Sequence, residues 1–528
     1  MTARLRIARA IGMTLLGAAT LFATPAMAAR TLAIGLSGDV TSIDPHFHNV
    51  TPNANVAEHI FDTLITKDEK MKLKPSLALS WKPIDDTTWE VKLRPNVKFH
   101  DGSEFTADDV VFSLARPATI KDSPSPYTIY TRAIVSATAP DKLTVRLKTA
   151  APYPLMPNDL STIYIVSKKA AANATKEDFT SGRASIGTGP FKFVKFEPGS
   201  RIELARNDAY WGGKSEWDTV TLRILTNDAA RVAALLANDV QVIENVPTAD
   251  YKKLETNAAL TLARTTSFRL MYLHLDTARD KSPMITDAAG KPLEKNPLKD
   301  VRVRQAISKA IARPALADRV MEGLAEPTGQ LMNSSMFGYD ARLKPEIYDP
   351  DGARKLLAEA GYPDGFNIAI DATNNRYVND DQLAQTISAM LSRVGIRTKV
   401  EAMPSSVFFT RANKLDFSLM LVGWGADTGE ASSTLKSLLA TYDAGKGWGV
   451  SNRGRYSNAV LDAKLTDAMA TVDDKKREGL LQEATVAGLS DYGVIPLFFN
   501  VSVWALRRGY TIVPRMDERT LASAVKGS

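Results

Sequence analysis

Residues 419–427 read Leu-Met-Leu-Val-Gly-Trp-Gly-Ala-Asp, and this stretch decides the fold class. Its first four residues form a continuous apolar run, which is typical of a strand buried on both faces in a parallel sheet. Two glycines then break the run. In open α/β sheets, ligands bind in the crevice beyond the carboxyl ends of the strands. The stretch therefore predicts a central strand that leads directly into a ligand site.

Asp427 is the first candidate binding residue, because it follows the predicted strand directly. A carboxylate in a closed cleft is costly to desolvate unless a cation, such as a free α-amino group, pairs with it. Trp424 offers flat apolar area that could pack on ligand atoms, and Gly425 follows it. The alternative is structural: Asp427 caps the next turn or helix, and Trp424 belongs to the core. The position in the sequence leaves both interpretations open.

Arg376 is the second candidate, in a polar loop that also contains Asn374. The loop follows the strand-like residues 368–370. A guanidinium group in this place could bind a ligand carboxylate through two parallel hydrogen bonds. The alternative is an arginine on an ordinary surface loop.

The rest of the chain alternates between strand-like and helix-like patterns. Residues 89–93 and 143–147 alternate apolar and polar side chains, as half-buried strands do. Residues 349–361 begin with Asp-Pro and end with Gly, which predicts a capped helix. Apolar residues between 383 and 394 share one helical face, and Thr106 with Asp109 resembles a capping box. These alternating segments predict an α/β or α+β protein.

The N-terminus has the three parts of a secretory signal peptide. Three arginines precede the apolar run 10–23, and Ala26-Met27-Ala28 resembles a cleavage site. The alternative, a membrane anchor, needs a run of about 20 residues, and this one is shorter. The sequence contains no cysteine, which excludes a lipid anchor at the cleavage site and any disulfide framework. We expect cleavage after Ala28 and a periplasmic protein that is not a lipoprotein.

Length and charge exclude other classes. A chain of 528 residues should divide into two or more domains. The formal net charge of +7 comes from basic residues that are scattered among 59 acidic ones. Nucleic-acid binders instead gather basic and aromatic residues on one face. We therefore expect no nucleic-acid partner.

Two chemical alternatives arise from short motifs. His46 and His48 could bind a metal if further ligands converged, although the neighbouring proline predicts a turn. Ser433-x-x-Lys436, with Tyr456-x-Asn458 after it, resembles motifs of periplasmic serine hydrolases. These two motifs lie close together and no Lys-Thr-Gly follows, so we expect no enzyme and no cofactor.

Several blocks resemble extracellular solute-binding protein family 5, the large binding proteins of peptide, nickel and opine importers. The blocks occur in the family's order over nearly all of the chain, and one block alone would carry little weight. They are residues 42–46, 75–81, 93–110, 187–191, 207–211, 303–307, 359–362 and 423–424.

The resemblance implies an α/β, two-lobed periplasmic binding protein-like fold (type II, cluster C) with an extra α+β domain inserted in lobe 1. The expected division is signal peptide 1–28, lobe 1 in residues 29–58, 186–268 and 492–528, inserted domain 59–185, and lobe 2 in residues 269–491. Gly187-Thr188-Gly189-Pro190 would lie at one crossing, where the glycines allow hinge motion or simply a tight turn.

The resemblance also implies a function and site roles. The chain would capture a peptide or peptide-like solute and deliver it, as a monomer, to an inner-membrane ABC permease. Asp427 matches the aspartate that takes a peptide's α-amino group, and Arg376 matches an arginine for the carboxylate. Tyr127, Ser37 and Gly38 would line the cleft.

One departure from the family pattern leaves the ligand open. Many peptide binders have Asp-Pro after the key aspartate, whereas this chain continues from Asp427 with Thr428-Gly429-Glu430-Ala431-Ser432. A non-peptide solute on the same fold (glutathione, an opine, haem, a nickel complex or a sugar) therefore stays an alternative, as does a chaperone or sensor role.

Overall fold

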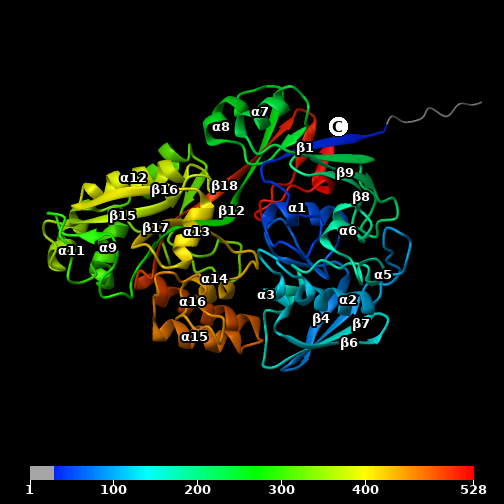
Figure 1. Ribbon diagram of the computed structural model, residues 1–528, viewed down its shortest axis with the longest axis horizontal. Helices are drawn as coiled ribbons and strands as arrows, with labels where there is room; N and C mark the ends of the chain where they lie inside the picture. The colour runs from blue at the N-terminus through cyan, green and yellow to red at the C-terminus, as the bar shows by residue number, and fades with distance from the viewer. Residues whose placement is uncertain (1–28, 528) are drawn as a thin grey trace, which may run out of the picture.

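The computed structural model describes residues 29–527. The predicted signal peptide lies outside these residues. Figure 1 shows two bodies side by side, connected by long strands that pass between them. We call the body that contains the N-terminal segment lobe 1 and the other body lobe 2. Within the described residues, no helix combines the length and the apolar character needed to cross a membrane.

The largest sheet among residues 29–527 extends through both lobes. Its central order is β13-β15-β17-β12-β18-β11-β1-β10-β9-β8, with β14 beside β18 and β16 beside β15. Its strands are β1 (Thr31–Leu36), β8 (Phe191–Glu197), β9 (Arg201–Arg206), β10 (Thr219–Ile224), β11 (Val242–Ile243), β12 (Leu260–Leu275), β13 (Ile285–Thr286), β14 (Ala325–Pro327), β15 (Phe366–Thr373), β16 (Ile396–Met403), β17 (Leu419–Gly425) and β18 (Val494–Arg507).

Strands β12 and β18 form the connection between the lobes. The first half of β12 pairs with the second half of β18. The last seven residues of β12 also pair with β17 in lobe 2. The register of the β12–β18 pair shifts between Thr266 and Leu270. The expected boundary at 268/269 falls within this shift, whereas the expected boundary at 491/492 precedes β18. The domain limits stay a prediction.

Lobe 1 carries a separate antiparallel sheet with the order β4-β5-β7-β6. This sheet and the hairpin β2–β3 lie within the expected inserted domain 59–185. The strands of the smaller sheets are β2 (Ile65–Lys67), β3 (Leu73–Pro75), β4 (Ala78–Asp85), β5 (Thr88–Leu93), β6 (Ile134–Asp141), β7 (Thr144–Thr149), β19 (Tyr510–Ile512) and β20 (Val525–Gly527). The helices of this half are α1 (Thr51–Ile60), α2 (Ala107–Ala115), α3 (Thr128–Thr131), α4 (Met156–Leu160), α5 (Lys168–Ala171), α6 (Lys176–Thr180), α7 (Asp228–Leu236) and α8 (Thr248–Glu255).

Lobe 2 has helices on both faces of its sheet. Leu419 and Leu421 of β17 pack in one core with α9, α11 and α12, whereas Met420 and Val422 pack in another with α13 to α16. The helices of this half are α9 (Val301–Lys309), α10 (Arg313–Ala315), α11 (Pro350–Glu359), α12 (Asp380–Ser392), α13 (Ser405–Asn413), α14 (Ala431–Leu438), α15 (Ala459–Met469) and α16 (Asp474–Ser490). The prediction of a strand buried on both faces is therefore confirmed.

The local signals for individual elements are confirmed, with one correction. Asp349 accepts a hydrogen bond from the Gly352 N–H at 2.8 Å as the N-cap of α11, and Asp109 accepts one from the Thr106 N–H at 3.0 Å. The sheet around β17 is mixed, however, and not parallel. β17 runs parallel to β15 and antiparallel to β12. An apolar run indicates burial on both faces, and helices that cover both faces bury a mixed sheet equally well.

Gly187 and Gly189 lie against the end of α1. A Cβ atom on Gly187 would stand 1.9 Å from the Ile60 carbonyl oxygen, and one on Gly189 would stand 2.7 Å from the same oxygen. The Gly189 N–H donates to this oxygen at 3.0 Å. Close packing thus requires glycine at both positions, which favours the tight-turn interpretation over a hinge here.

Candidate functional site

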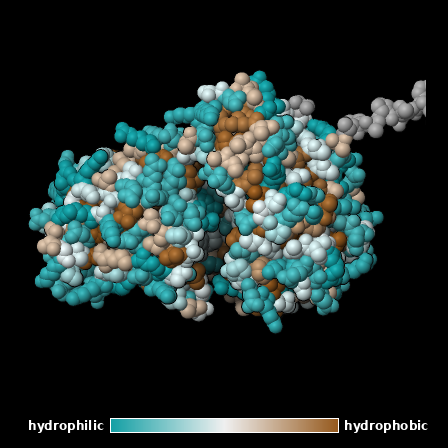
Figure 2. Space-filling view, turned by 45° about the horizontal axis from the view of Figure 1, so that its top comes forward, coloured by the Kyte–Doolittle hydropathy of each residue, from teal (hydrophilic) through white to brown (hydrophobic). Residues whose placement is uncertain are grey.

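The space between the lobes holds two adjoining cavities of about 690 and 960 Å³. Figure 2 shows the surface hollowed between the two halves of the molecule. The eight predicted site residues all line one or both cavities. The first cavity has Asp427, Trp424, Gly425, Arg376 and Tyr127 in its wall, and the second has Ser37, Gly38, Asn374 and again Arg376.

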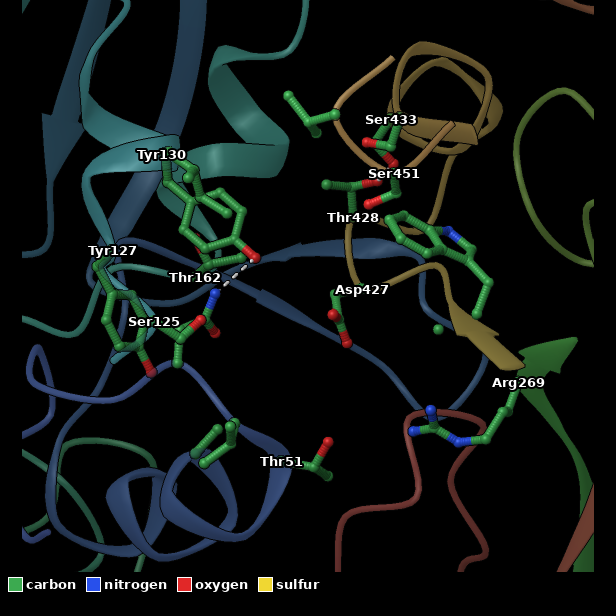
Figure 3. Close-up of a pocket in the computed structure, with 18 of the residues that line it drawn as sticks. Thr51, Ser125, Tyr127, Tyr130, Thr162, Arg269, Asp427, Thr428, Ser433 and Ser451 are labelled. Atoms are coloured by element: carbon green, nitrogen blue, oxygen red, sulfur yellow. Dashed lines mark hydrogen bonds between the residues drawn. The ribbon is translucent and has the colours of Figure 1, made fainter. Parts of the chain in front are cut away.

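Asp427 follows β17 at the edge of the first cavity. The Lys67 ammonium of lobe 1 donates to its backbone carbonyl oxygen at 2.8 Å, which holds this turn against the opposite lobe. Figure 3 shows the carboxylate extending into the cavity between two tyrosines and Arg269. Within residues 29–527, this carboxylate has no hydrogen-bond or ion-pair partner. The Asp427 side chain is exposed to water in the cavity. Partial desolvation by the surrounding protein nevertheless raises the pKa of its carboxyl group, although the positive charges of Arg269 and Lys67 act in the opposite direction.

Arg269 is a cavity cation that the sequence analysis missed. It lies on β12 directly beside Gly425 of β17. Glu518 accepts hydrogen bonds from it, the shortest at 2.7 Å, and both side chains are largely buried. Arg269 is thus already neutralised by protein and leaves Asp427 available. A local motif could not have revealed this pair, because its members are 249 positions apart.

Arg376 lies in the loop between β15 and α12. The Asp380 carboxylate accepts hydrogen bonds from the Arg376 and Tyr377 N–H groups, each at 3.1 Å, and so fixes the loop backbone. The guanidinium carbon is 5.7 Å from the Tyr377 ring centre. Among the described residues, this exposed guanidinium has no carboxylate partner. Asn374 is exposed in the same loop, on the side of the second cavity.

Trp424 and Tyr127 give the first cavity aromatic walls. The Trp424 indole N–H donates to the Thr434 hydroxyl at 3.0 Å, which fixes the ring beside the cavity. Tyr127 is buried, and burial raises its pKa far above the ordinary value, so its phenol stays neutral. The neighbouring Tyr130 hydroxyl accepts a hydrogen bond from Asn49 at 3.2 Å (Figure 3).

Ser37 and Gly38 border the second cavity. The Ser37 N–H and hydroxyl donate to the Glu244 carboxylate at 2.9 and 3.0 Å. A Cβ atom on Gly38 would stand 2.5 Å from the Pro52 ring, so only glycine fits there without a shift. Ser37 and Gly38 therefore line a different cavity from Asp427.

The first cavity is also lined by charged residues that the sequence analysis missed. Asp159 lines it, and the Tyr153 hydroxyl donates to its carboxylate at 2.6 Å. Burial raises the pKa of Asp159 to about 7, against the opposing effects of the Tyr153 hydrogen bond and Lys436. Arg132 and Arg453 also line the cavity, as does Lys436 of the Ser-x-x-Lys motif. No short motif surrounds Asp159, Arg132 or Arg453, so only the folded chain identifies them.

The two histidines of the metal alternative make separate contacts. His46 is buried, with its Nε2 atom 2.8 Å from the Tyr164 carbonyl oxygen, while His48 Nδ1 is 2.8 Å from the Thr41 hydroxyl. Burial lowers the pKa of His46 to about 4. Residues 29–527 hold no cluster of three potential metal ligands of the His, Cys, Asp and Glu types.

Of the residues of the hydrolase alternative, Ser433 and Lys436 line the first cavity and Tyr456 does not. The Ser433 hydroxyl is 2.5 Å from the Thr428 hydroxyl. Tyr456 is buried away from the cavity lining, and its hydroxyl accepts a hydrogen bond from Asn458 at 2.9 Å.

Comparison with known proteins identifies the family. Residues 72–446 match the family described as "Bacterial extracellular solute-binding proteins, family 5 Middle". The chain belongs to this family of solute-binding proteins. The glutathione-binding protein GsiB of Pectobacterium atrosepticum is 31% identical over 478 residues, which cover 88% of each chain.

Two solved structures show the same fold as this family 5 protein. CtaP, an ABC transporter substrate-binding protein from Listeria monocytogenes, aligns with a TM-score of 0.80 at 22% identity, over 94% of this chain and 99% of that one. The periplasmic binding protein DppA from Helicobacter pylori, in complex with the peptide STSA, aligns with a TM-score of 0.77 at 24% identity, over 94% and 98%. The predicted two-lobed α/β fold is confirmed.

Membership of family 5 makes this chain a solute-binding component of an ABC importer. Its homologues are binding proteins of transport systems and not enzymes. Proteins of this family are periplasmic, bind peptides or related ligands, and work with ABC permeases.

Proposed function

We propose that this family 5 protein captures a short peptide or peptide-like solute between its lobes and delivers it to an inner-membrane permease. Asp427 pairs with the ammonium group of the solute, and Arg376 pairs with a carboxylate. Two similar proteins support this ligand class: GsiB binds glutathione, which is itself a peptide-like solute, and DppA, which has the same fold, was solved in complex with the peptide STSA.

The observation that carries the proposal is the Asp427 carboxylate, which extends into the cavity without a protein partner. A carboxylate that loses water in a closing cleft needs a cation. Arg269 on the same wall is already bound to Glu518, and the Lys67 ammonium of the opposite lobe donates to the Asp427 backbone carbonyl oxygen and not to its carboxylate. A ligand ammonium therefore supplies the missing charge. The cavity volume of about 690 Å³ lies within the range of about 300–1,000 Å³ that is typical of small-ligand sites.

Lobe closure follows from the placement of the contacts. Asp427 and Arg376 belong to lobe 2, whereas Tyr127 and Tyr130 belong to the opposite wall. A solute that touches both walls binds the closed form better than the open form, and this difference in affinity stabilises closure.

The proposal predicts that Asp427→Asn weakens the binding of short peptides by about thirty-fold or more. Removing one partner of a desolvated charge pair costs about 2–5 kcal/mol, and about 2 kcal/mol corresponds to thirty-fold. The measurement is calorimetric titration of refolded, ligand-free protein with di- to pentapeptides and glutathione.

Two controls make this test specific. Asp86→Asn, at an exposed aspartate outside both cavities, should leave affinity unchanged. N-acetylated peptides, which lack the ammonium, should bind weakly to wild type and equally weakly to Asp427→Asn. Equal affinity of free and acetylated peptides would contradict the role of Asp427, and no binding by any peptide would contradict the ligand class.

We also propose that the chain is exported, cleaved after Ala28 and monomeric. The basic start, the apolar run 10–23 and the small residues before Ala29 support cleavage at this bond. Intact-mass measurement of the periplasmic protein should give a chain that begins at Ala29 without lipid, and light scattering should give one copy. An uncleaved or dimeric protein would contradict this part of the proposal.

A further inference from the structure

Arg453 is one of three arginines of the first cavity, with Arg376 and Arg132, that have no ion-pair partner among the described residues. It lies in the loop between α14 and α15, and it is only partly exposed. Its guanidinium donates to the Asn413 side-chain oxygen at 3.0 and 3.2 Å, and its central carbon lies 5.5 Å from the Phe409 ring centre. In the part of the chain that the structure describes, no carboxylate pairs with it.

The surroundings of Arg453 destabilise the charged form of its guanidinium group. Burial lowers the pKa of Arg453, and the groups that oppose this effect are the phenols of Tyr272 and Tyr377 and no carboxylate. Two buried arginines of the framework have carboxylate partners: Arg116 pairs with Asp44, and Arg477 pairs with Glu430. The buried Arg313 is instead satisfied by the carbonyl oxygens of Pro496 and Ser308 and by the Ser308 hydroxyl. Arg453 differs from all three because it lines a cavity.

The backbone around Arg453 is held rigidly. Asn452 is fully buried, and its side-chain amide donates to the carbonyl oxygens of Ala440 and Tyr456 at 3.0 and 2.7 Å. A Cβ atom on Gly454 would stand 1.9 Å from the Leu275 carbonyl oxygen of β12, so the loop lies directly against the sheet. Such a fixed backbone holds the guanidinium in place before any ligand arrives.

Arg376, Arg453 and Tyr377 line the same cavity. The Arg376 guanidinium lies over the Tyr377 ring, with its central carbon 5.7 Å from the ring centre. The Tyr377 hydroxyl in turn donates to the Gly423 carbonyl oxygen of β17 at 3.1 Å. Among the described residues of the lobe 2 wall, Asp427 is a carboxylate without an ion-pair partner, and Arg376 and Arg453 are guanidinium groups without one, beside the Lys436 ammonium of α14.

We infer that Arg453 binds a second carboxylate of the solute, so that the site selects peptides with one more carboxylate than ammonium groups. This inference rests on the proposed function, because it assigns the ligand class of the same cavity. A guanidinium group suits a carboxylate through two parallel hydrogen bonds, and the bond is stronger where water is excluded. A neutral side chain in the same place would leave Arg453 desolvated and unpaired.

The test compares matched peptides that differ in one charge. Calorimetric titrations use Ala-Ala-Ala tripeptides with Glu at each position in turn and the same set with Gln, together with glutathione and its monoethyl ester. Wild type should bind the best Glu peptide at least about tenfold more tightly than its Gln partner. Arg453→Gln should reduce this ratio to about one while it leaves the Gln peptide within about threefold of wild type.

Two further variants control for structure. Arg455→Gln changes an arginine of the same loop that does not line the cavity, and it should keep the wild-type ratio. Arg453→Lys keeps the charge without the planar fork, so it should give an intermediate ratio even if Arg453→Gln does not fold.

The outcomes separate the two claims. Equal binding of Glu and Gln peptides by wild type, or an unchanged ratio in Arg453→Gln, would overturn the inference while the peptide-binding function stands. If no peptide and no glutathione derivative binds to wild type, both the proposed function and the inference are overturned.

Discussion

Replacing Arg116 by methionine is expected to lower the free energy of unfolding by about 3–5 kcal/mol, because it leaves the Asp44 carboxylate buried without its cation. Arg116 donates to the two oxygens of Asp44 at 2.7 and 2.6 Å, and the two side chains are 5% and 2% exposed. The pair joins the segment after α2 to the N-terminal segment of lobe 1. Urea unfolding of the ligand-free protein, followed by tryptophan fluorescence, measures the loss.

A double variant separates the buried charge from lost packing. Asp44→Asn removes the charge but keeps an oxygen for the His46 N–H, which donates to Asp44 at 3.0 Å. The combination Arg116→Met with Asp44→Asn should therefore be more stable than Arg116→Met alone. If the double variant is less stable by the sum of both single losses, the charge is not the cause.

A surface pair supplies the comparison. Arg302 binds Asp300 at 2.6 Å with similar geometry, but its side chain is 46% exposed. Arg302→Met should cost less than about 1 kcal/mol, because exposed ion pairs contribute little.

The sequence was sufficient to predict what depends on neighbours along the chain. The apolar run of β17 and the cap of α11 at Asp349 follow from local pattern, and the structure confirms both elements. The resemblance of ordered blocks to family 5 predicted the two-lobed fold. Asp427 and Arg376 do line one cavity, although their binding roles stay proposals.

The sequence was not sufficient where a residue's role depends on distant partners. Arg269 and Arg453 are both arginines of the same cavity, yet the guanidinium of Arg269 binds the Glu518 carboxylate and that of Arg453 binds the neutral Asn413 amide. Nothing adjacent to either residue in the sequence indicates this difference. Gly187 and Gly189 are a further case in which the role depends on a distant residue. The sequence allowed either a hinge or a tight turn, and the Ile60 carbonyl close to both glycines favours the tight turn.

Asp159→Asn is expected to stabilise the protein at pH 8 by about 2–4 kcal/mol and to change its stability little at pH 4. Burial raises the pKa of Asp159 in the folded protein to about 7, above its ordinary value of 3.8. The folded state therefore holds this proton more tightly than the unfolded chain does. Ionisation of Asp159 thus begins to penalise the folded state above about pH 4, and the penalty is complete above about pH 7.

Asparagine removes this penalty and keeps the local hydrogen bond. Its side-chain oxygen can still accept from the Tyr153 hydroxyl, which now donates to Asp159 at 2.6 Å. The gain is smaller than the full pKa shift implies, because Lys436 loses a favourable carboxylate neighbour. Urea unfolding at pH 4, 6 and 8 should show a growing advantage for Asp159→Asn, with exposed Asp86→Asn as the control. An advantage that is equal at all three pH values would contradict the assignment. Since Asp159 lines the first cavity, the expected penalty lies at the binding site itself, where perturbed carboxyl groups commonly serve function and not stability.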